Sequence, residues 1–155
     1  LGEDNWNNDI DVGGGRIIGE ACHFVDLLRY LNGNKIKDLS AKSLSNTGNK
    51  ISETYTITIE FNDGSMGTIH YLADGHNSFP KERLEVFADN SIIQLDNFRK
   101  LKYWNSNGFK VTRRKQDKGH DQCIKKFLDC IKSGMKSPIP IDEIFEVQNY
   151  LINSI

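Results

Sequence analysis

The sequence predicts an α+β fold, in which a largely antiparallel open sheet carries helices on one face. Three observations support this class: a segment with helical periodicity comes first, a run of segments with two-residue alternation follows, and two helical segments close the chain. Helices and strands that occupy separate blocks of sequence pack as an antiparallel sheet covered on one side. At 155 residues, the chain has the length of a single domain.

The first helix is expected from Gly19 to Leu31. Its apolar residues recur at helical spacing, and they are Ala21, Phe24, Val25, Leu28 and Leu31. Asn32 and Gly33 end it, because glycine readily takes the left-handed conformation that closes a helix. Residues 1–12 are rich in Asn and Asp, so we expect an irregular arm that leads into the glycine triplet at residues 13–15.

Strands are expected next, because the period of the apolar residues changes to two. One segment alternates apolar with polar side chains, as a strand with one buried face does, and its apolar members are Tyr55, Ile57, Ile59 and Phe61. The turn Asn62–Asp63–Gly64 leads into a partner strand at residues 66–72. Further strands are expected at residues 36–44, 83–87, 91–95, 101–104 and 109–113.

Two helices are expected to close the chain. The first ends at Gly134, and its apolar stripe is Ile124, Phe127, Leu128 and Ile131. In the second, Asp142 is expected to cap the amino terminus, and the residues expected to face the core are Ile144, Val147, Leu151 and Ile155. The other face of the sheet stays open and half apolar, so we expect it to meet a second copy or a partner domain.

The charge and the cysteines exclude several classes of protein. With 20 Lys and Arg against 21 Asp and Glu, the net charge of -1 gives no field that would attract nucleic acid or an anionic membrane. The sequence has no apolar run long enough to span a bilayer and no signal-peptide pattern. Cys22, Cys123 and Cys130 lack metal-ligand spacing, so we expect no metal site, and buried reduced thiols in a cytoplasmic protein.

His23 and Asp26 are the candidates for proton transfer. On a helical wheel they lie, with Tyr30, on a flank away from the apolar stripe. Asp26 follows His23 by three positions, close enough for its carboxylate to orient an imidazole, and histidine titrates near neutrality, where acid or base work is easiest. A purely structural pair of histidine and carboxylate is the alternative.

The glycine triplet before this helix is the candidate substrate-binding segment. Gly14 and Gly15 remove side chains where the backbone would approach a ligand. Arg16 beside them could hold a hydroxyl, a carboxylate or a phosphate. An ordinary flexible loop is the alternative interpretation. His70, in contrast, lies in a predicted strand, where a structural histidine is favoured.

The segment GGGRIIGEACHFVDLLRYLNG, with the closing GHDQCIKKFLDCIKSGMKSPIPIDEIFEVQNYLINSI, resembles the C-terminal domain of the Gfo/Idh/MocA oxidoreductase family. The usual pattern of that family is a glycine-rich loop, an acidic residue, and then His-x-x-Asp on one helix. The resemblance covers nearly the whole chain. The stretches RIIGEACHFVDLLRYL and FPKERLEVFADNSIIQLDNF are also similar to two-part oxidoreductases, in which an alcohol dehydrogenase-like half precedes such a domain.

The resemblance implies the substrate-binding half of an NAD- or NADP-dependent oxidoreductase that acts on a hydroxyl of a sugar, nucleotide-sugar or inositol-like substrate. It implies that His23 is a general acid/base or a substrate ligand. The family's acidic residue, four positions earlier, falls on Gly19 in this sequence, which is a departure from the pattern. Glu20 is the nearest substitute, about 100° further round the helix. We therefore expect Arg16 and Glu20, with the glycine loop, at the substrate.

The sequence contains no G-x-G-x-x-G fingerprint, so we expect NAD or NADP to be bound mainly by an N-terminal Rossmann domain absent from this chain. Because the chain begins at Leu1, we expect a single substrate-side and oligomerisation domain of a longer protein, inactive alone. The expected partners are a polyol or sugar, the cofactor domain, and a second copy through the open sheet face. The rival is a non-catalytic oligomerisation or binding module, in which Gly19 marks a lost site.

Overall fold

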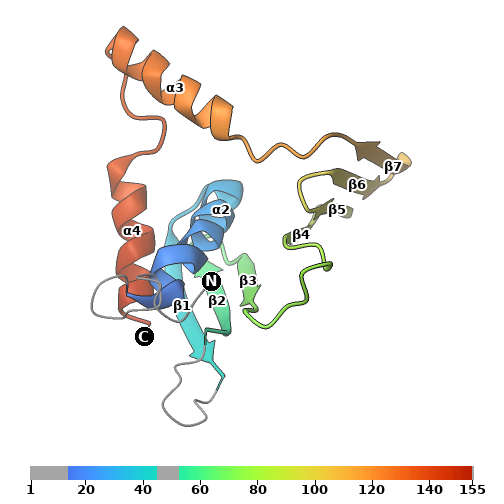
Figure 1. Ribbon diagram of the computed structural model, residues 1–155, viewed down its shortest axis with the longest axis horizontal. Helices are drawn as coiled ribbons and strands as arrows, with labels where there is room; N and C mark the ends of the chain where they lie inside the picture. Colours follow the sequence, from blue (N-terminus) through green and yellow to red (C-terminus); the bar gives the residue numbers. More distant parts are fainter. Residues whose placement is uncertain (1–13, 45–52, 155) are drawn as a thin grey trace. The chain divides into compact units, whose positions relative to one another are not determined.

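The computed structural model describes residues 14–44 and 53–154 (Figure 1). The chain divides into two compact units, one of Leu1–Asp74 with Ile139–Ile155 and one of Gly75–Pro138. The predicted arm at residues 1–12, Gly13 and Ile155 lie outside the described residues. The α+β class and the antiparallel pairing of the strands are confirmed. The expectation of a single domain stays a prediction.

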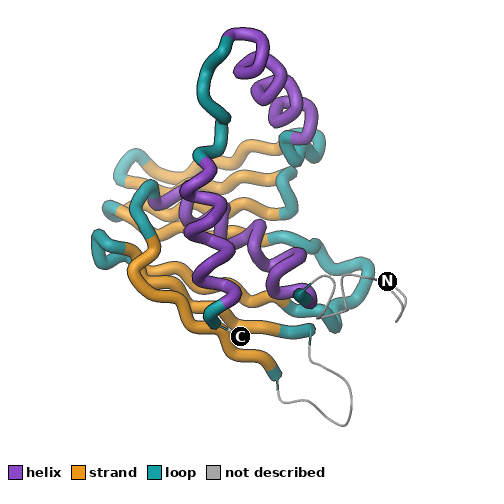
Figure 2. The backbone as a smooth tube through the Cα atoms, turned by 90° about the vertical axis from the view of Figure 1, so that its left-hand side faces the viewer, coloured by secondary structure: helices purple, strands orange, loops and turns teal. Residues whose placement is uncertain are grey.

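The first unit packs two helices on one face of a three-stranded sheet (Figure 2). Both strand pairs are antiparallel, in the order β1-β2-β3. Helix α2 contacts β3, helix α4 contacts β1, and the two helices contact each other. The elements of this unit are η2 (Ile17–Ala21), α2 (Cys22–Asn32), β1 (Ile36–Ser43), β2 (Tyr55–Phe61), β3 (Met66–Tyr71) and α4 (Ile141–Ile152).

The core of this unit lies between the sheet and the helices. In β2, alternate side chains face the helices and are buried: Ile57, Ile59 and Phe61. The residues between them point to the other face, as the two-residue period of a strand requires. Val25 of α2 and Leu151 of α4, both fully buried, complete the core from the helix side.

Glycines end α2 and the helix of the second unit, and a glycine forms the hairpin turn, where the sequence predicted them. Gly33, with φ of 77°, ends α2, and its N–H donates to the carbonyl of Arg29 at 3.0 Å. Gly64, with φ of 83°, lies in the turn between β2 and β3. Gly134, with φ of 67°, ends the helix of the second unit. These left-handed conformations are the ones that glycine adopts without steric cost.

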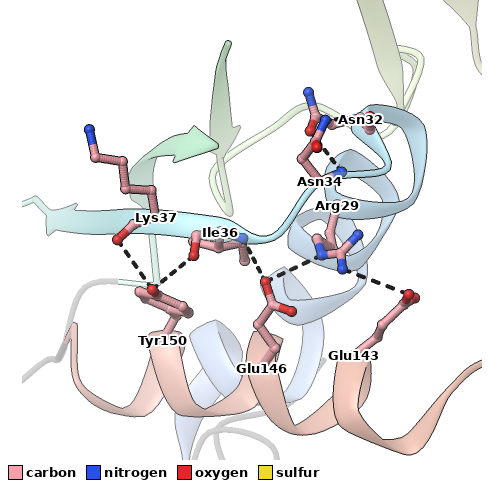
Figure 3. Close-up of polar contacts among 8 residues, drawn as sticks. All are labelled: Arg29, Asn32, Asn34, Ile36, Lys37, Glu143, Glu146 and Tyr150. Atoms are coloured by element: carbon pink, nitrogen blue, oxygen red, sulfur yellow. Dashed lines mark hydrogen bonds and ion pairs between the residues drawn. The ribbon is translucent and has the colours of Figure 1, made fainter. Parts of the chain in front are cut away.

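Polar contacts around Glu146 hold α4 against α2 and β1 (Figure 3). Arg29 is only 6 % exposed, and its Nε lies 3.3 Å from Oε1 of Glu146 while its Nη2 lies 3.7 Å from Oε1 of Glu143. The backbone N–H of Ile36 donates to the same Glu146 oxygen at 2.5 Å. The Tyr150 hydroxyl donates to the Ile36 carbonyl at 2.9 Å. A buried guanidinium has lost its hydration, so it needs such carboxylate partners to offset the cost.

The second unit contains a four-stranded antiparallel sheet and helix α3 (His120–Ser133). The strands follow one another in the order β4 (Arg83–Ala88), β5 (Ser91–Asp96), β6 (Lys100–Asn105) and β7 (Gly108–Arg113). Within the described residues, the strands are thus hydrogen-bonded as two antiparallel sheets, one in each unit. Alternation predicts which face a residue takes, but it does not say which strands pair.

Three predictions of burial or capping are wrong. Ile144 was expected in the core, but it is 40 % exposed, because it lies in the first turn of its helix. Cys123 is exposed on α3, whereas Cys22 and Cys130 are buried as expected. Asp142 does not cap α4: the cap residue is Pro140, and Asp142 lies in the first helical turn.

Candidate functional site

The candidate site lies where the first helix begins. Gly14 and Gly15 have φ of 69° and 72°, which side chains rarely adopt. A Cβ on Gly14 would lie 2.9 Å from the Cβ of Ile18, so the turn is too tight for any other residue. The helix then starts with the π-helical turn η2 before it continues as α2. The sequence did not predict this wider turn, a form found often at functional sites.

Arg16 reaches from this turn to the sheet. Its Nε lies 3.0 Å from Oε2 of Glu53, two residues before β2, and its side chain is only 14 % exposed. Its guanidinium also hydrogen-bonds with the phenol of Tyr71, the last residue of β3. Burial acts to lower the pKa of Arg16, but Tyr71 and Glu53 outweigh it and raise that pKa. The guanidinium is therefore a fixed positive charge.

Glu20 reaches the same tyrosine from one turn further along the helix. The Tyr71 hydroxyl donates a short hydrogen bond to Oε2 of Glu20. Burial, followed by this hydrogen bond, raises the pKa of Tyr71 to about 12, against the opposing effect of Arg16. The phenol therefore stays protonated at neutral pH and acts as a donor. Phe24, four residues after Glu20, packs beside the Tyr71 ring with centroids 6.3 Å apart.

Tyr55 lies directly opposite Tyr71 in the β2–β3 pair. Burial and the nearby charge of Glu53 raise the pKa of Tyr55 as well. Among the described residues, the Tyr55 hydroxyl has no hydrogen-bond partner. We call the four connected side chains, Arg16, Glu20, Glu53 and Tyr71, the helix-start network.

His23 and Asp26 are not members of the helix-start network. His23 is exposed and Asp26 is half-buried, and Tyr30 on the same flank is 77 % exposed, as predicted for a flank away from the core. Within the described residues, no hydrogen bond or ion pair joins His23 to Asp26, so their pairing stays a prediction. Glu20 contacts Tyr71, whereas His23 faces solvent.

Sequence reasoning identified Arg16 and Glu20 but missed their partners, Tyr71 and Glu53. A signal existed for Tyr71, because it continues the core-facing alternation of Ile69 in β3 and pairs with Tyr55. No comparable signal marked Glu53, which precedes its strand and meets Arg16 from a distant part of the sequence. The register of β2 against β3 is what brings both partners to the helix start.

Three further observations concern the described residues. They include no group of three or more His, Cys, Asp or Glu placed to bind a metal ion, and none of their helices has the length and apolar character to cross a membrane. Cys22, the first residue of α2, is buried, and burial raises the pKa of its thiol, which is therefore protonated at neutral pH.

Comparison with known proteins identifies the family of the chain. A sequence model described as the GFO/IDH/MocA C-terminal domain matches residues 2–94, which is more than half of the chain. The chain belongs to the GFO/IDH/MocA family. The matched residues include the glycine turn, Glu20 and His23, and also Tyr71 and Glu53, the partners of Arg16 and Glu20 in the helix-start network. No curated protein matches the chain.

Solved structures confirm the fold of this GFO/IDH/MocA domain. The aldose-aldose oxidoreductase of Caulobacter crescentus, complexed with glycerol, superposes with a TM-score of 0.79 at 12% identity, over 99% of this chain and 50% of that one. The UDP-N-acetylglucosamine 3-dehydrogenase of Acidithiobacillus ferrooxidans gives 0.73 at 15% identity, over 88% and 45%. An oxidoreductase of Agrobacterium radiobacter, in complex with NAD+, L-tartaric acid and magnesium, gives 0.74 at 14% identity, over 89% and 46%. The chain thus spans about half the length of these proteins.

Proposed function

We propose that the chain is the substrate-binding half of an NAD(P)-dependent oxidoreductase that acts on a hydroxyl of a sugar, nucleotide-sugar or inositol-like substrate. Membership of the GFO/IDH/MocA family supports the reaction class. The similar folds of an aldose-aldose oxidoreductase and a UDP-N-acetylglucosamine dehydrogenase support the substrate class. The observation that carries the proposal is the exposed imidazole of His23, on the helix that follows a glycine turn and supplies Arg16 and Glu20 to a partly buried polar network.

In this proposal, His23 accepts the proton of the reacting hydroxyl and Asp26 supports its imidazole. Gly14 and Gly15 let the substrate approach the backbone, and Arg16 and Glu20 lie near its hydroxyl groups. A nicotinamide would accept the hydride. The residues of this chain do not fit a dinucleotide, because they lack the glycine fingerprint that binds its pyrophosphate. We therefore propose that NAD or NADP is held mainly by an N-terminal Rossmann domain, whether or not an alcohol dehydrogenase-like half is also present.

A non-catalytic binding or oligomerisation module is the second candidate. The position of Gly19 favours it, because the family's acidic residue is expected there and Glu20 is turned toward Tyr71.

In either case, we propose a homo-oligomer through an open sheet face, in a cytoplasmic protein. One row of side chains across the second sheet supports this: Phe87, Ile92, Trp104 and Phe109, of which the two phenylalanines are 69 % and 55 % exposed.

Substitution of His23 separates the two candidates. In the full-length protein, we expect His23→Ala to lower kcat for NAD(P)-linked oxidation of a sugar by about a hundredfold or more, the usual effect of removing a general base. His70→Ala is the matched control, because His70 is also exposed but hydrogen-bonds to Thr56 in the sheet. Wild-type kcat in the His23→Ala variant would exclude the catalytic role. A full-length protein that oxidises no sugar would favour the binding module.

A further inference from the structure

The helix-start network carries more negative than positive charge. Glu20 and Glu53 contribute two carboxylates and Arg16 contributes one guanidinium, so its formal charge is -2 + 1 = -1. The positive charge is not available to an incoming anion on its own, because Glu53 lies 3.0 Å from the Arg16 Nε. An anionic substrate group that approached the network would therefore meet the excess of carboxylate charge.

Glu20 presents one oxygen to the network and keeps the other available. Its Oε2 accepts the hydrogen bond of the Tyr71 hydroxyl. Its Oε1 receives no hydrogen bond from any residue that the structure describes, and it is not among the fully buried unpaired atoms. A carboxylate oxygen is a strong acceptor and cannot donate, so its natural complement is a hydroxyl or an amide N–H.

Tyr71 and Glu53 fix the position of that carboxylate. Tyr71 is held by the ring of Phe24 on one side and by the Arg16 guanidinium at its hydroxyl. Glu53 in turn fixes Arg16. Because the Tyr71 pKa is raised to about 12, its hydroxyl is a permanent donor over the working pH range. The acceptor on Glu20 is thus oriented before any ligand arrives, which reduces the ordering needed on binding.

We propose that Tyr71 and Glu53 are positioning residues of the substrate site, and that the helix-start network selects uncharged polyol groups over their carboxylate analogues. The inference rests on the proposed function for the location of the substrate. It adds Tyr71 and Glu53 to the proposed substrate site, and it adds a preference for uncharged substrates over substrates that carry a carboxylate. The network binds the hydroxyl-bearing ring through Glu20, and it repels a carboxylate placed on the same ring.

Binding measurements on matched sugars test this preference without depending on turnover. The full-length protein is titrated by calorimetry with glucose and glucuronate, galactose and galacturonate, and UDP-N-acetylglucosamine and its uronate. Each pair differs by one carboxylate in place of a CH2OH group. We expect at least one neutral member to bind about tenfold or more tightly than its uronate. Binding of no neutral member, or equal binding of the two members of every pair, would overturn the proposal.

Variants assign the preference to the network. Glu20→Gln keeps a hydrogen-bond acceptor but removes the charge, so we expect the ratio of neutral to uronate affinity to fall about tenfold. Tyr71→Phe keeps the ring against Phe24 and removes the donor, and we expect neutral-sugar binding to weaken by about tenfold. Glu53→Gln frees Arg16 from its carboxylate, so uronate binding is expected to strengthen.

The matched control is Tyr55→Phe, because Tyr55 is paired with Tyr71 in the sheet but lies outside the network. We expect its affinities to equal those of the unmodified protein. An unchanged affinity ratio in both Glu20→Gln and Glu53→Gln would contradict the charge preference, even if Tyr71→Phe failed to fold. A protein that binds neutral sugars selectively but transfers no hydride would refute the proposed function and leave this inference intact.

Discussion

Tyr71 is the residue whose ionisation makes the clearest prediction. Burial and the hydrogen bond to Glu20 raise its pKa from an ordinary 10.0 to about 12, so the folded chain holds this proton more tightly than the unfolded chain does. The stability that this contributes is complete below pH 10, and it is lost as the pH rises from 10 through about 12.

The measurement is the free energy of unfolding against pH, for the unmodified protein and for Tyr71→Phe. We expect the unmodified protein to lose more stability than the variant across the interval from pH 10 to about 12. The difference in tyrosinate absorbance between the two proteins should show one phenol that ionises above the ordinary range. Parallel curves for the two proteins would mean that Tyr71 does not donate to Glu20.

At the scale of single residues, the sequence pointed to one of the two residues in each contact of the helix-start network. Arg16 and Glu20 are visible because they flank a glycine turn and begin a periodic helix. Their partners Tyr71 and Glu53 come from strand ends, and their place depends on the register of β2 and β3. Register follows from packing over the whole sheet, so no local pattern specifies it.

At the scale of elements, the docking of α4 depends on the buried guanidinium of Arg29. In Arg29→Met, the alkyl volume is kept, but Glu146 loses its charged partner while it stays mostly buried. We expect the free energy of unfolding to fall by about 2 kcal/mol, as when one partner of a buried ion pair is removed. Urea denaturation of the variant measures this loss.

Two comparisons show whether the loss comes from the unpaired carboxylate. The double variant Arg29→Met with Glu146→Gln should recover part of the stability, because no uncompensated charge is then buried. Lys37→Met removes one partner of the exposed Lys37–Glu60 ion pair, whose atoms lie 2.6 Å apart, and should leave the denaturation midpoint unchanged. A single Arg29→Met variant as stable as the unmodified protein would contradict this description of how α4 is held.

The elements themselves could be predicted well, because their periods are regular. The alternation in β2 and the glycines that close α2 and α3 are local signals, and the structure has strands and helix ends where they indicated. Arg29 could not be predicted as a core residue, because its burial depends on Glu143 and Glu146 more than a hundred residues later. The π-helical start of the helix had no local signal either.

At the scale of the whole molecule, the domain spans about half the length of its structural relatives, and the function proposed for it requires a second domain. The sequence predicted the α+β class and the family, because both depend on element order and on the first-helix motif. It did not predict the division of the strands between two sheets, which depends on pairings between strands rather than on any one of them.

The most direct test of the central claim is a fluorescence titration of NADH and NADPH into the full-length protein and, in parallel, into the 155-residue chain. Circular dichroism of the chain serves as the control that it is folded. We predict saturable binding of one or both cofactors by the full-length protein and none by the chain. Binding by the folded chain alone, or by neither protein, would contradict the claim that this is the substrate side of a nicotinamide-dependent oxidoreductase.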